Sequence, residues 1–454
     1  MKKAEPERRR SSSASKKSTS KKSRQQNSSV RPVASGNSSR NGKQRARVSF
    51  PRSAIKRNPN GIPDYRLEDW PCIVRTEWVE GELRYKIVGE LKRPVPPLRE
   101  SKYLNKQQSL EIYRFMLMHR RVEETLETLY KQSKVVGGVY FGLGQEGCSV
   151  ASAYALSPDD WLGPMIRNQG AYLVRGFRPR DTMLQYMAKA DSPTGGKESS
   201  SAFGDHRQRN ILAPVSHLGD SIPALAGVAL GARLQGKNIA CLTYIGDGGQ
   251  STGSTYEGFN FAAVQKLGVI VLVENNLWAY STPSEMQFAC KDLADRSLGY
   301  GVPGAIVDGT DANQVYDVVY EAVQRAHRGE GASLIEAKML RMKGHAIHDS
   351  AAYVPEELRE YWRQRDPIAR MEKYLTVKGW LTSAIQNKIA QEVARIIEED
   401  RAFSEASPMP AREAAAQGVY CDDQELPLKY GQPRIRKIRT TKELKSAGGL
   451  GHLS

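Results

Sequence analysis

The chain has 454 residues, a formal net charge of +17 and five cysteines without a CxxC pair. Its longest apolar runs, such as residues 269–273, are too short to span a bilayer, so no membrane-spanning segment and no membrane partner are predicted. The scattered cysteines argue against a disulfide framework or a zinc site and favour a reducing, cytoplasmic compartment of the bacterial kind.

The positive charge is concentrated at the N-terminus. Residues 1–60 hold 18 of the 67 Lys and Arg residues but only two of the 50 acidic ones, which leaves a net charge of +1 on residues 61–454. Residues 1–29 have almost no apolar side chains and no aromatic ring to stack on a base. We therefore favour a disordered, solvated basic tail over one that binds nucleic acid or an acidic protein surface. The missing apolar face also argues against a secretory signal and against import into the mitochondrial matrix.

The next part of the chain is mixed and then helical. Residues 61–105 contain several prolines, and we interpret them as an N-terminal lead-in. From about residue 106, apolar residues recur at helical spacing, which predicts a long helix over QQSLEIYRFMLMHRRVEETLETLYKQ. A Gly-rich loop then leads into a second helix, residues 177–210 begin helical and become a polar loop, and a helix of small residues follows in HLGDSIPALAGVALGARLQGK.

Strands and helices alternate most clearly after residue 238. Residues 239–245 and 269–274 are short apolar runs typical of buried parallel strands, and residues 254–266 between them have helical periodicity. The alternation continues through AIVDGTD, a helix over residues 313–328, and SLIEAKML, and then come closing helices in EELREYWRQRDPIARMEKYL and SAIQNKIAQEVARIIEEDRAF. This order predicts an α/β fold with a parallel sheet flanked by helices. The predicted parts are the tail (1–60), the lead-in (61–105), the main domain (106–410) and a polar C-terminal extension (411–454).

Two polar motifs follow the two predicted strands. Asp247 lies between Gly246 and Gly248 directly after the first strand, and an asparagine pair ending in Asn276 follows the second. Parallel strands end at the same edge of a sheet, where open α/β sheets bind ligands, so we expect these side chains to meet. The glycines, Gly249 included, let the backbone approach an anion. Hard oxygen ligands beside such amides suit Mg²⁺ bound together with a diphosphate.

Either motif alone is a common turn and carries little weight. Together, GDG, 26 intervening residues (249–274) and NN, with a predicted helix and strand between them, match the thiamin-diphosphate-binding signature. A kinase-type phosphate loop is disfavoured, because the chain has no GxxxxGK(S/T) motif. A nicotinamide-binding Rossmann site is disfavoured, because no GxGxxG follows a strand.

Residues from about 106 to 410 resemble the alpha subunit of the decarboxylating component of 2-oxoacid dehydrogenase complexes, in its two-subunit form. The resemblance rests on stretches in the expected order: GLGQEGCSV, MIRNQGAYLVRG, GDGGQSTGSTYEGFNFAAVQKLGVIVLVENNLWAYSTP, YGVPGAIVDGTD, LIEAKMLRMKGHAIHDSAAY and RDPIARMEKYL. It implies a thiamin-diphosphate-binding fold and the oxidative decarboxylation of a 2-oxoacid. The acyl group would pass to a lipoyl group on a partner acyltransferase.

The resemblance also assigns residues to thiamin diphosphate and Mg²⁺. It implies that Mg²⁺ is held by the Asp247 carboxylate, the Asn276 side chain and the main-chain carbonyl of Trp278. Arg167 would pair with diphosphate oxygens, a task that suits a guanidinium. The remaining cofactor positions are backbone ones, with Gly246, Gly248 and Gly249 at the diphosphate and Ser216 and Leu218 at the aminopyrimidine.

A loop near residue 345 is implied to lie by the reacting carbon. His345, in RMKGHAIHD, matches a histidine that contacts the cofactor and stabilises charge or moves a proton there. Arg341 and Asp349 match residues that order this loop, and we count Arg341 with His345 as catalytic. Ala346 stands where animal relatives carry a phosphorylatable serine, so that switch is missing. Without the resemblance, His345 and His348 would be interpreted as an exposed loop pair.

Ile166, Gln169 and His119 are not assigned a role in binding or catalysis. Ile166 and Gln169 stand where the family more often has tyrosine and histidine, which leaves the shape of this wall open. We interpret His119, inside the first long helix, as structural.

The resemblance finally implies a shared active site. Family members need a glutamate from a pyrimidine-binding half, and the residues after the single GDG–NN motif are too few for that half. We therefore expect a beta subunit in an α₂β₂ heterotetramer, a lipoyl-bearing acyltransferase as partner, and a 2-oxoacid as substrate. The substrate stays open between pyruvate and a branched-chain 2-oxoacid such as 2-oxoisovalerate. Two other classes also stay open: a related thiamin enzyme such as acetoin dehydrogenase, and a binding function of the basic tail.

Overall fold

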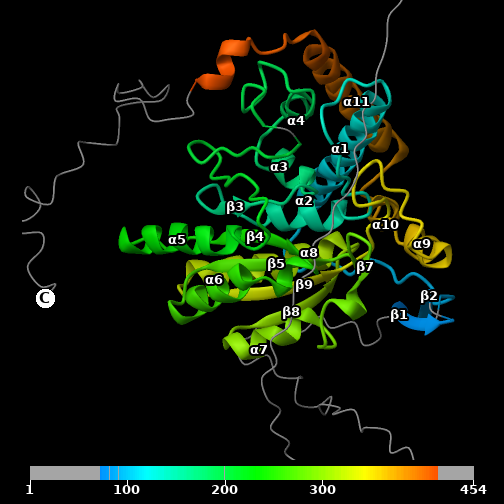
Figure 1. The fold of residues 1–454 in the computed structure, drawn as a ribbon, viewed down its shortest axis with the longest axis vertical. Coiled ribbons are helices and arrows are strands. Elements are labelled where there is room, and N and C mark those ends of the chain that lie inside the picture. Colours follow the sequence, from blue (N-terminus) through cyan, green and yellow to red (C-terminus); the bar gives the residue numbers. More distant parts are fainter. Residues whose placement is uncertain (1–71, 81, 90, 199, 418–454) are drawn as a thin grey trace, which may run out of the picture. The chain divides into compact units, whose positions relative to one another are not determined.

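The computed structural model describes residues 72–80, 82–89, 91–198 and 200–417 (Figure 1). The predicted disordered tail, residues 1–60, lies outside the described residues, as does most of the predicted C-terminal extension. The lead-in contains an antiparallel hairpin, β1 (Cys72–Val79) and β2 (Glu82–Gly89), which the sequence analysis did not predict. Within the described ranges, no helix is long and apolar enough to cross a lipid bilayer.

A five-stranded parallel sheet lies at the centre of the main domain. Its strand order is β3-β4-β5-β9-β8, with bounds β3 (Trp161–Gly163), β4 (Cys241–Gly246), β5 (Val269–Asn275), β8 (Gly304–Asp308) and β9 (Ser333–Lys338). β4 and β5 are hydrogen-bonded neighbours in parallel register, so that Gly246 lies opposite Glu274. The predicted α/β fold is confirmed. The GDG and NN motifs accordingly follow adjacent strand ends, and a short hairpin of β6 (Trp278–Ala279) and β7 (Thr282–Pro283) comes next.

Helices precede, separate and follow these strands. They are α1 (Lys106–Lys131), α2 (Glu146–Tyr154), α3 (Gln169–Val174), α4 (Pro179–Tyr186), α5 (Ser221–Leu234), α6 (Gly253–Val264), α7 (Ser297–Tyr300), α8 (Ala312–His327), α9 (Glu356–Arg363), α10 (Pro367–Val377) and α11 (Ser383–Ala406). Short 3₁₀ turns are η2 (Gly249–Ser251), η3 (Ser284–Met286), η4 (Leu293–Arg296) and η5 (Arg412–Ala416). The stretch 356–375 forms two helices, because Asp366 caps α10 and Pro367 occupies its first position.

Both faces of the sheet are covered by helices (Figure 1). Ile270 and Leu272 of β5 pack in one buried cluster with side chains of α2 and α8. Val271 and Val273 of the same strand pack in another cluster with side chains of α5 and α6. Because side chains alternate along a strand, this two-sided burial explains why β5 is apolar without interruption until Glu274. Polar side chains that could bind a ligand are therefore expected at the ends of the strands and not on the faces of the sheet.

Candidate functional site

Asp247 is buried at the end of β4. Its side chain accepts hydrogen bonds from Ser284 Oγ at 3.2 Å and from Gln287 Nε2 at 2.9 Å. Burial raises the pKa of this carboxyl group to about 6, although both hydrogen bonds favour the charged form. The sequence analysis did not predict Ser284 or Gln287, which reach Asp247 from the turn after β7. A carboxylate held this way carries charge at a desolvation cost that a bound cation would offset.

Asn276 lies directly after β5 and is also buried. Within the described part of the chain its Oδ1 atom has no hydrogen-bond partner. Ser284 links this strand end to the previous one, since its Oγ also donates to Asn275 Oδ1 at 3.3 Å. Leu277 has a positive φ of 72°, an uncommon conformation for a branched residue. The two strand ends therefore bring together a carboxylate and an amide oxygen that needs a partner.

Close packing requires glycine at the two positions that follow Asp247, Gly248 and Gly249. A Cβ atom on Gly248 would lie 2.5 Å from Ala279 Cβ, and one on Gly249 would lie 2.8 Å from Ile245 Cγ1. Leu218 is the next neighbour of Gly249, with its Cβ 3.5 Å from that position, and its side chain is 47% exposed. Gly246 faces open space among the described residues, and Ser216 is exposed. Leu218 thus lies at the predicted diphosphate cradle, whereas Ser216 is not among the nearest neighbours of Gly248 or Gly249 in the described part of the chain.

Arg167 and His345 lie against each other. Arg167 donates from Nη1 to the Phe141 carbonyl oxygen at 2.8 Å and from Nη2 to the His345 carbonyl oxygen at 2.8 Å. Burial, and then Arg341, lower the pKa of Arg167 to about 10. The His345 ring packs against Tyr140 and Tyr280, with ring centroids 5.5 Å and 4.5 Å away. Burial, followed by Arg167 and Arg341, lowers the pKa of His345 to about 4, so the imidazole is neutral near pH 7.

Arg341 connects the β6–β7 hairpin to the His345 loop. Its guanidinium donates to the carbonyl oxygens of Trp278 at 3.3 Å and Tyr280 at 2.7 Å, and to the Tyr353 hydroxyl. Asp349 holds the other side of the loop by accepting from the His345 backbone N–H at 2.6 Å and from Tyr353 at 2.6 Å. These contacts are those of loop-ordering residues. The predicted catalytic role of Arg341 stays a prediction.

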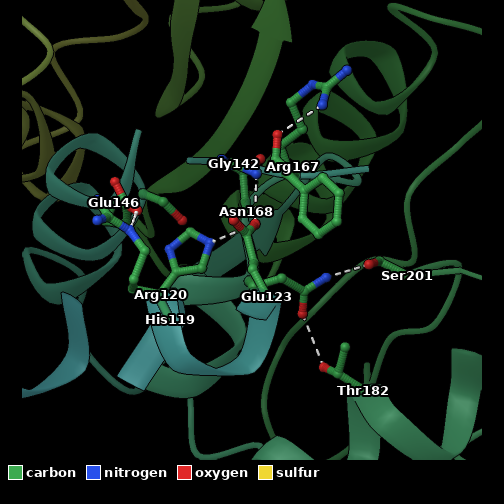
Figure 2. Close-up of polar contacts among 12 residues, drawn as sticks. His119, Arg120, Glu123, Gly142, Glu146, Arg167, Asn168, Thr182 and Ser201 are labelled. Atoms are coloured by element: carbon green, nitrogen blue, oxygen red, sulfur yellow. Dashed lines mark hydrogen bonds and ion pairs between the residues drawn. The ribbon is translucent and has the colours of Figure 1, made fainter. Parts of the chain in front are cut away.

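The residues that follow Arg167 anchor its segment to the rest of the fold. Asn168 donates to Glu274 Oε1 at 2.7 Å, which joins the loop after β3 to the end of β5. Burial raises the pKa of Glu274 to about 7. Gln169 forms hydrogen bonds with Thr182 at 2.9 Å and with Ser201. Figure 2 labels these two partners. The glutamine that replaces the commoner histidine at position 169 therefore has hydrogen-bond partners within the protein.

A cavity of about 200 Å³ has a lining that includes none of the predicted site residues. It is lined by Arg120, Leu143, Gly144, Thr310, Leu340, Met342, Trp362, Arg363, Arg365 and Asp366. Its charged groups are engaged internally, since Arg120 pairs with Asp366 at 2.8 Å and with Glu146. We therefore place the candidate site at the ends of β4 and β5 and not in this cavity.

Comparison with known proteins identifies the family of the main domain. Residues 113–413 match the family described as dehydrogenase E1 component. The chain is 36% identical to the 2-oxoisovalerate dehydrogenase subunit alpha of Bacillus subtilis over 70% of this chain and 96% of that protein. It is 31% identical to the alpha subunit of the acetoin:2,6-dichlorophenolindophenol oxidoreductase of Cupriavidus necator, over 70% and 95%. It is also 31% identical to the pyruvate dehydrogenase E1 component subunit alpha of Rhizobium meliloti, over 67% and 88%.

Proposed function

We propose that this chain, which belongs to the dehydrogenase E1 component family, is the alpha subunit of a thiamin-diphosphate-dependent 2-oxoacid dehydrogenase. The reaction would be the oxidative decarboxylation of a 2-oxoacid, with transfer of the acyl group to a lipoyl group. The observation that carries the proposal is a pair of buried side chains at the ends of the adjacent strands β4 and β5. They are the Asp247 carboxylate and the Asn276 amide, whose Oδ1 has no hydrogen-bond partner among the described residues.

The donor set fits Mg²⁺ and a diphosphate. Asp247, the Asn276 amide oxygen and the Trp278 carbonyl oxygen are hard oxygen ligands of the kind that Mg²⁺ prefers, and they would hold the ion together with the diphosphate. Gly248 and Gly249 would admit the diphosphate to the backbone. Arg167 would supply the countercharge. Bound thiamin diphosphate supplies the electron sink that decarboxylation requires.

His345 would act as a neutral imidazole. With a pKa of about 4, it can donate or accept a hydrogen bond at the reacting carbon without carrying a charge of its own. Arg341 and Asp349 would keep the loop in place, and Tyr140 and Tyr280 would shield the ring from water. The contribution of this chain to catalysis is therefore anchoring, exclusion of water and proton handling.

We further propose that the active site is completed by a beta subunit in an α₂β₂ assembly, which would deliver acyl groups to a lipoyl-bearing acyltransferase. The exposure of Leu218 next to Gly249 supports an open edge that another chain could cover. The printed names of the relatives in B. subtilis and R. meliloti, each a subunit alpha, support the same view.

The substrate class can be tested directly. The pair formed by this chain and its beta subunit should release CO₂ from 2-oxoisovalerate or pyruvate when thiamin diphosphate and Mg²⁺ are present. A parallel assay with acetoin and 2,6-dichlorophenolindophenol tests the second candidate, which the relative in C. necator supports. Turnover of acetoin without CO₂ release from either 2-oxoacid would replace our proposal by that alternative.

A further inference from the structure

One buried carboxylate has no part in the site described above. Glu123 lies on α1, is 3% exposed, and receives two contacts on a single oxygen, Oε1. The Gly142 backbone N–H donates to this oxygen at 2.5 Å, and His119 Nε2 lies 3.1 Å from it. His119 is itself fully buried and can hold the carboxylate in one orientation. The long first helix therefore presents a fixed negative group to the Gly-rich loop that follows it.

The peptide that Glu123 holds is the same peptide that holds Arg167. The Gly142 N–H and the Phe141 carbonyl belong to one planar unit, in which the two groups point in opposite directions. Glu123 binds the N–H end, and Arg167 Nη1 binds the carbonyl end at 2.8 Å. Figure 2 shows Glu123 and Arg167 on the two sides of this peptide. A carboxylate at the positive end and a guanidinium at the negative end polarise the peptide in the same sense, so each contact strengthens the other.

The fit leaves no room for adjustment. A Cβ atom on Gly142 would lie 2.5 Å from the Arg167 carbonyl oxygen and 3.3 Å from both Glu123 Oε1 and His119 Cε1. Only glycine allows the loop to pass between α1 and the segment that carries Arg167. The other hydrogen-bonding face of Arg167, its Nη2, points to His345. The contact that leads to Glu123 and the contact to His345 therefore use the two different terminal nitrogens of the guanidinium.

We propose that Glu123 is a positioning residue that acts through the Phe141–Gly142 peptide to orient Arg167 toward the cofactor diphosphate. This inference rests on the proposed function, because it takes Arg167 as the diphosphate ligand. Glu123 does not touch the cofactor. Its effect is to hold the guanidinium ready before binding, which removes an ordering cost from the binding step.

A nearby acid provides a matched control. Glu146, at the start of α2, is fully buried and likewise accepts from a backbone N–H of the same loop, that of Gly144, at 2.9 Å. Its charged partner is Arg120, which is directed to Asp366 and not to Arg167. Loss of either carboxylate removes a buried charge from the same loop, but only Glu123 shares a peptide with Arg167.

The experiment measures thiamin diphosphate binding by calorimetry, with Mg²⁺ present, to the full chain co-purified with its beta subunit. Glu123→Ala should weaken binding by roughly 10- to 100-fold, the range expected for losing a charge-assisted hydrogen bond. Glu123→Gln retains an amide oxygen for the Gly142 N–H and should recover part of that loss. Glu146→Gln should change the affinity by less than about 2-fold, even if it lowers the melting temperature as much as Glu123→Gln does. In an Arg167→Ala background, Glu123→Gln should cause no further loss.

Each outcome decides a separate question. A wild-type complex that binds no thiamin diphosphate refutes the proposed function and the inference with it. Wild-type binding that a folded Glu123→Ala variant leaves unchanged refutes the positioning role alone. Equal losses from Glu123→Gln and Glu146→Gln, or a further loss when Arg167 is already absent, would show that the effect does not pass through Arg167. The isosteric glutamine variant keeps the test valid if the alanine variant does not fold.

Discussion

Arg167 and His345 are 178 residues apart in sequence, yet Arg167 Nη2 lies 2.8 Å from the His345 carbonyl oxygen and 3.4 Å from its Nδ1 atom. The side chain proposed to anchor the diphosphate therefore adds to the effect of burial in lowering the pKa of the histidine proposed to act at the reacting carbon. Since the guanidinium disfavours an imidazolium beside it, the two roles depend on each other.

The first prediction concerns the protonation of His345. Its pKa in the folded chain is about 4, below the ordinary value of 6.5, so the unfolded chain takes up the proton first as the pH falls. The stability that neutral His345 contributes is thus present above pH 6.5 and is lost as the pH falls toward 4. Relative to His345→Ala, the wild-type chain should lose melting temperature across this window. A titration of the His345 Cε1 proton by NMR with a midpoint at or above 6.5 would contradict the structure.

The second prediction concerns the role of His345 in turnover. His345→Ala should lower turnover by about 10²–10⁴-fold, the usual contribution of a general acid–base group, while the affinity for thiamin diphosphate changes little. His348→Ala is the control, because His348 is exposed in the same loop. Assays are compared at saturating cofactor. Equal losses in both variants would leave only a role in loop order, and no loss in either would remove His345 from the mechanism.

The third prediction concerns Asp247. Replacing groups that only support a metal ligand typically lowers affinity 10- to 100-fold, so Asp247→Ala should weaken Mg²⁺-dependent cofactor binding by more than about 100-fold. Ser284→Ala removes only a hydrogen bond to that carboxylate and should cost about 10-fold. The cofactor-free chain should lose no stability in Asp247→Ala at pH 7, since burial disfavours the ionised carboxyl there. Calorimetric binding that is unchanged in Asp247→Ala would refute the ligand assignment.

The fold was predictable where the pattern of apolar residues along the sequence indicates directly which side chains are buried. The apolar runs that became β4 and β5 and the helix between them were recognised because strands buried on both faces are continuously apolar. From parallel pairing, the approach of Asp247 to the NN motif followed without further information. The β1–β2 hairpin was not predicted, because the prolines around it suggested an irregular segment.

The supporting contacts of the site could not be predicted. Ser284 and Gln287 reach Asp247 across about 40 residues, and Asn168 meets Glu274 across 106. Glu123 looked like an ordinary polar position of an amphipathic helix, and His119 was interpreted only as structural. Each side chain gains its meaning from a partner that tertiary packing supplies, and periodicity reports burial without naming partners. Arg167, Arg341 and His345 were reached through a family resemblance and not through spacing.

The central claim is that this chain forms one half of a 2-oxoacid-decarboxylating site. The most direct measurement is the release of labelled CO₂ from 1-¹⁴C-labelled 2-oxoisovalerate and pyruvate by this chain alone, by its beta subunit alone and by the two together, with and without thiamin diphosphate and Mg²⁺. We predict release from at least one substrate only when both chains and the cofactor are present. Release by this chain alone would contradict a shared site, and no release from either 2-oxoacid by the cofactor-loaded pair would contradict the proposed function.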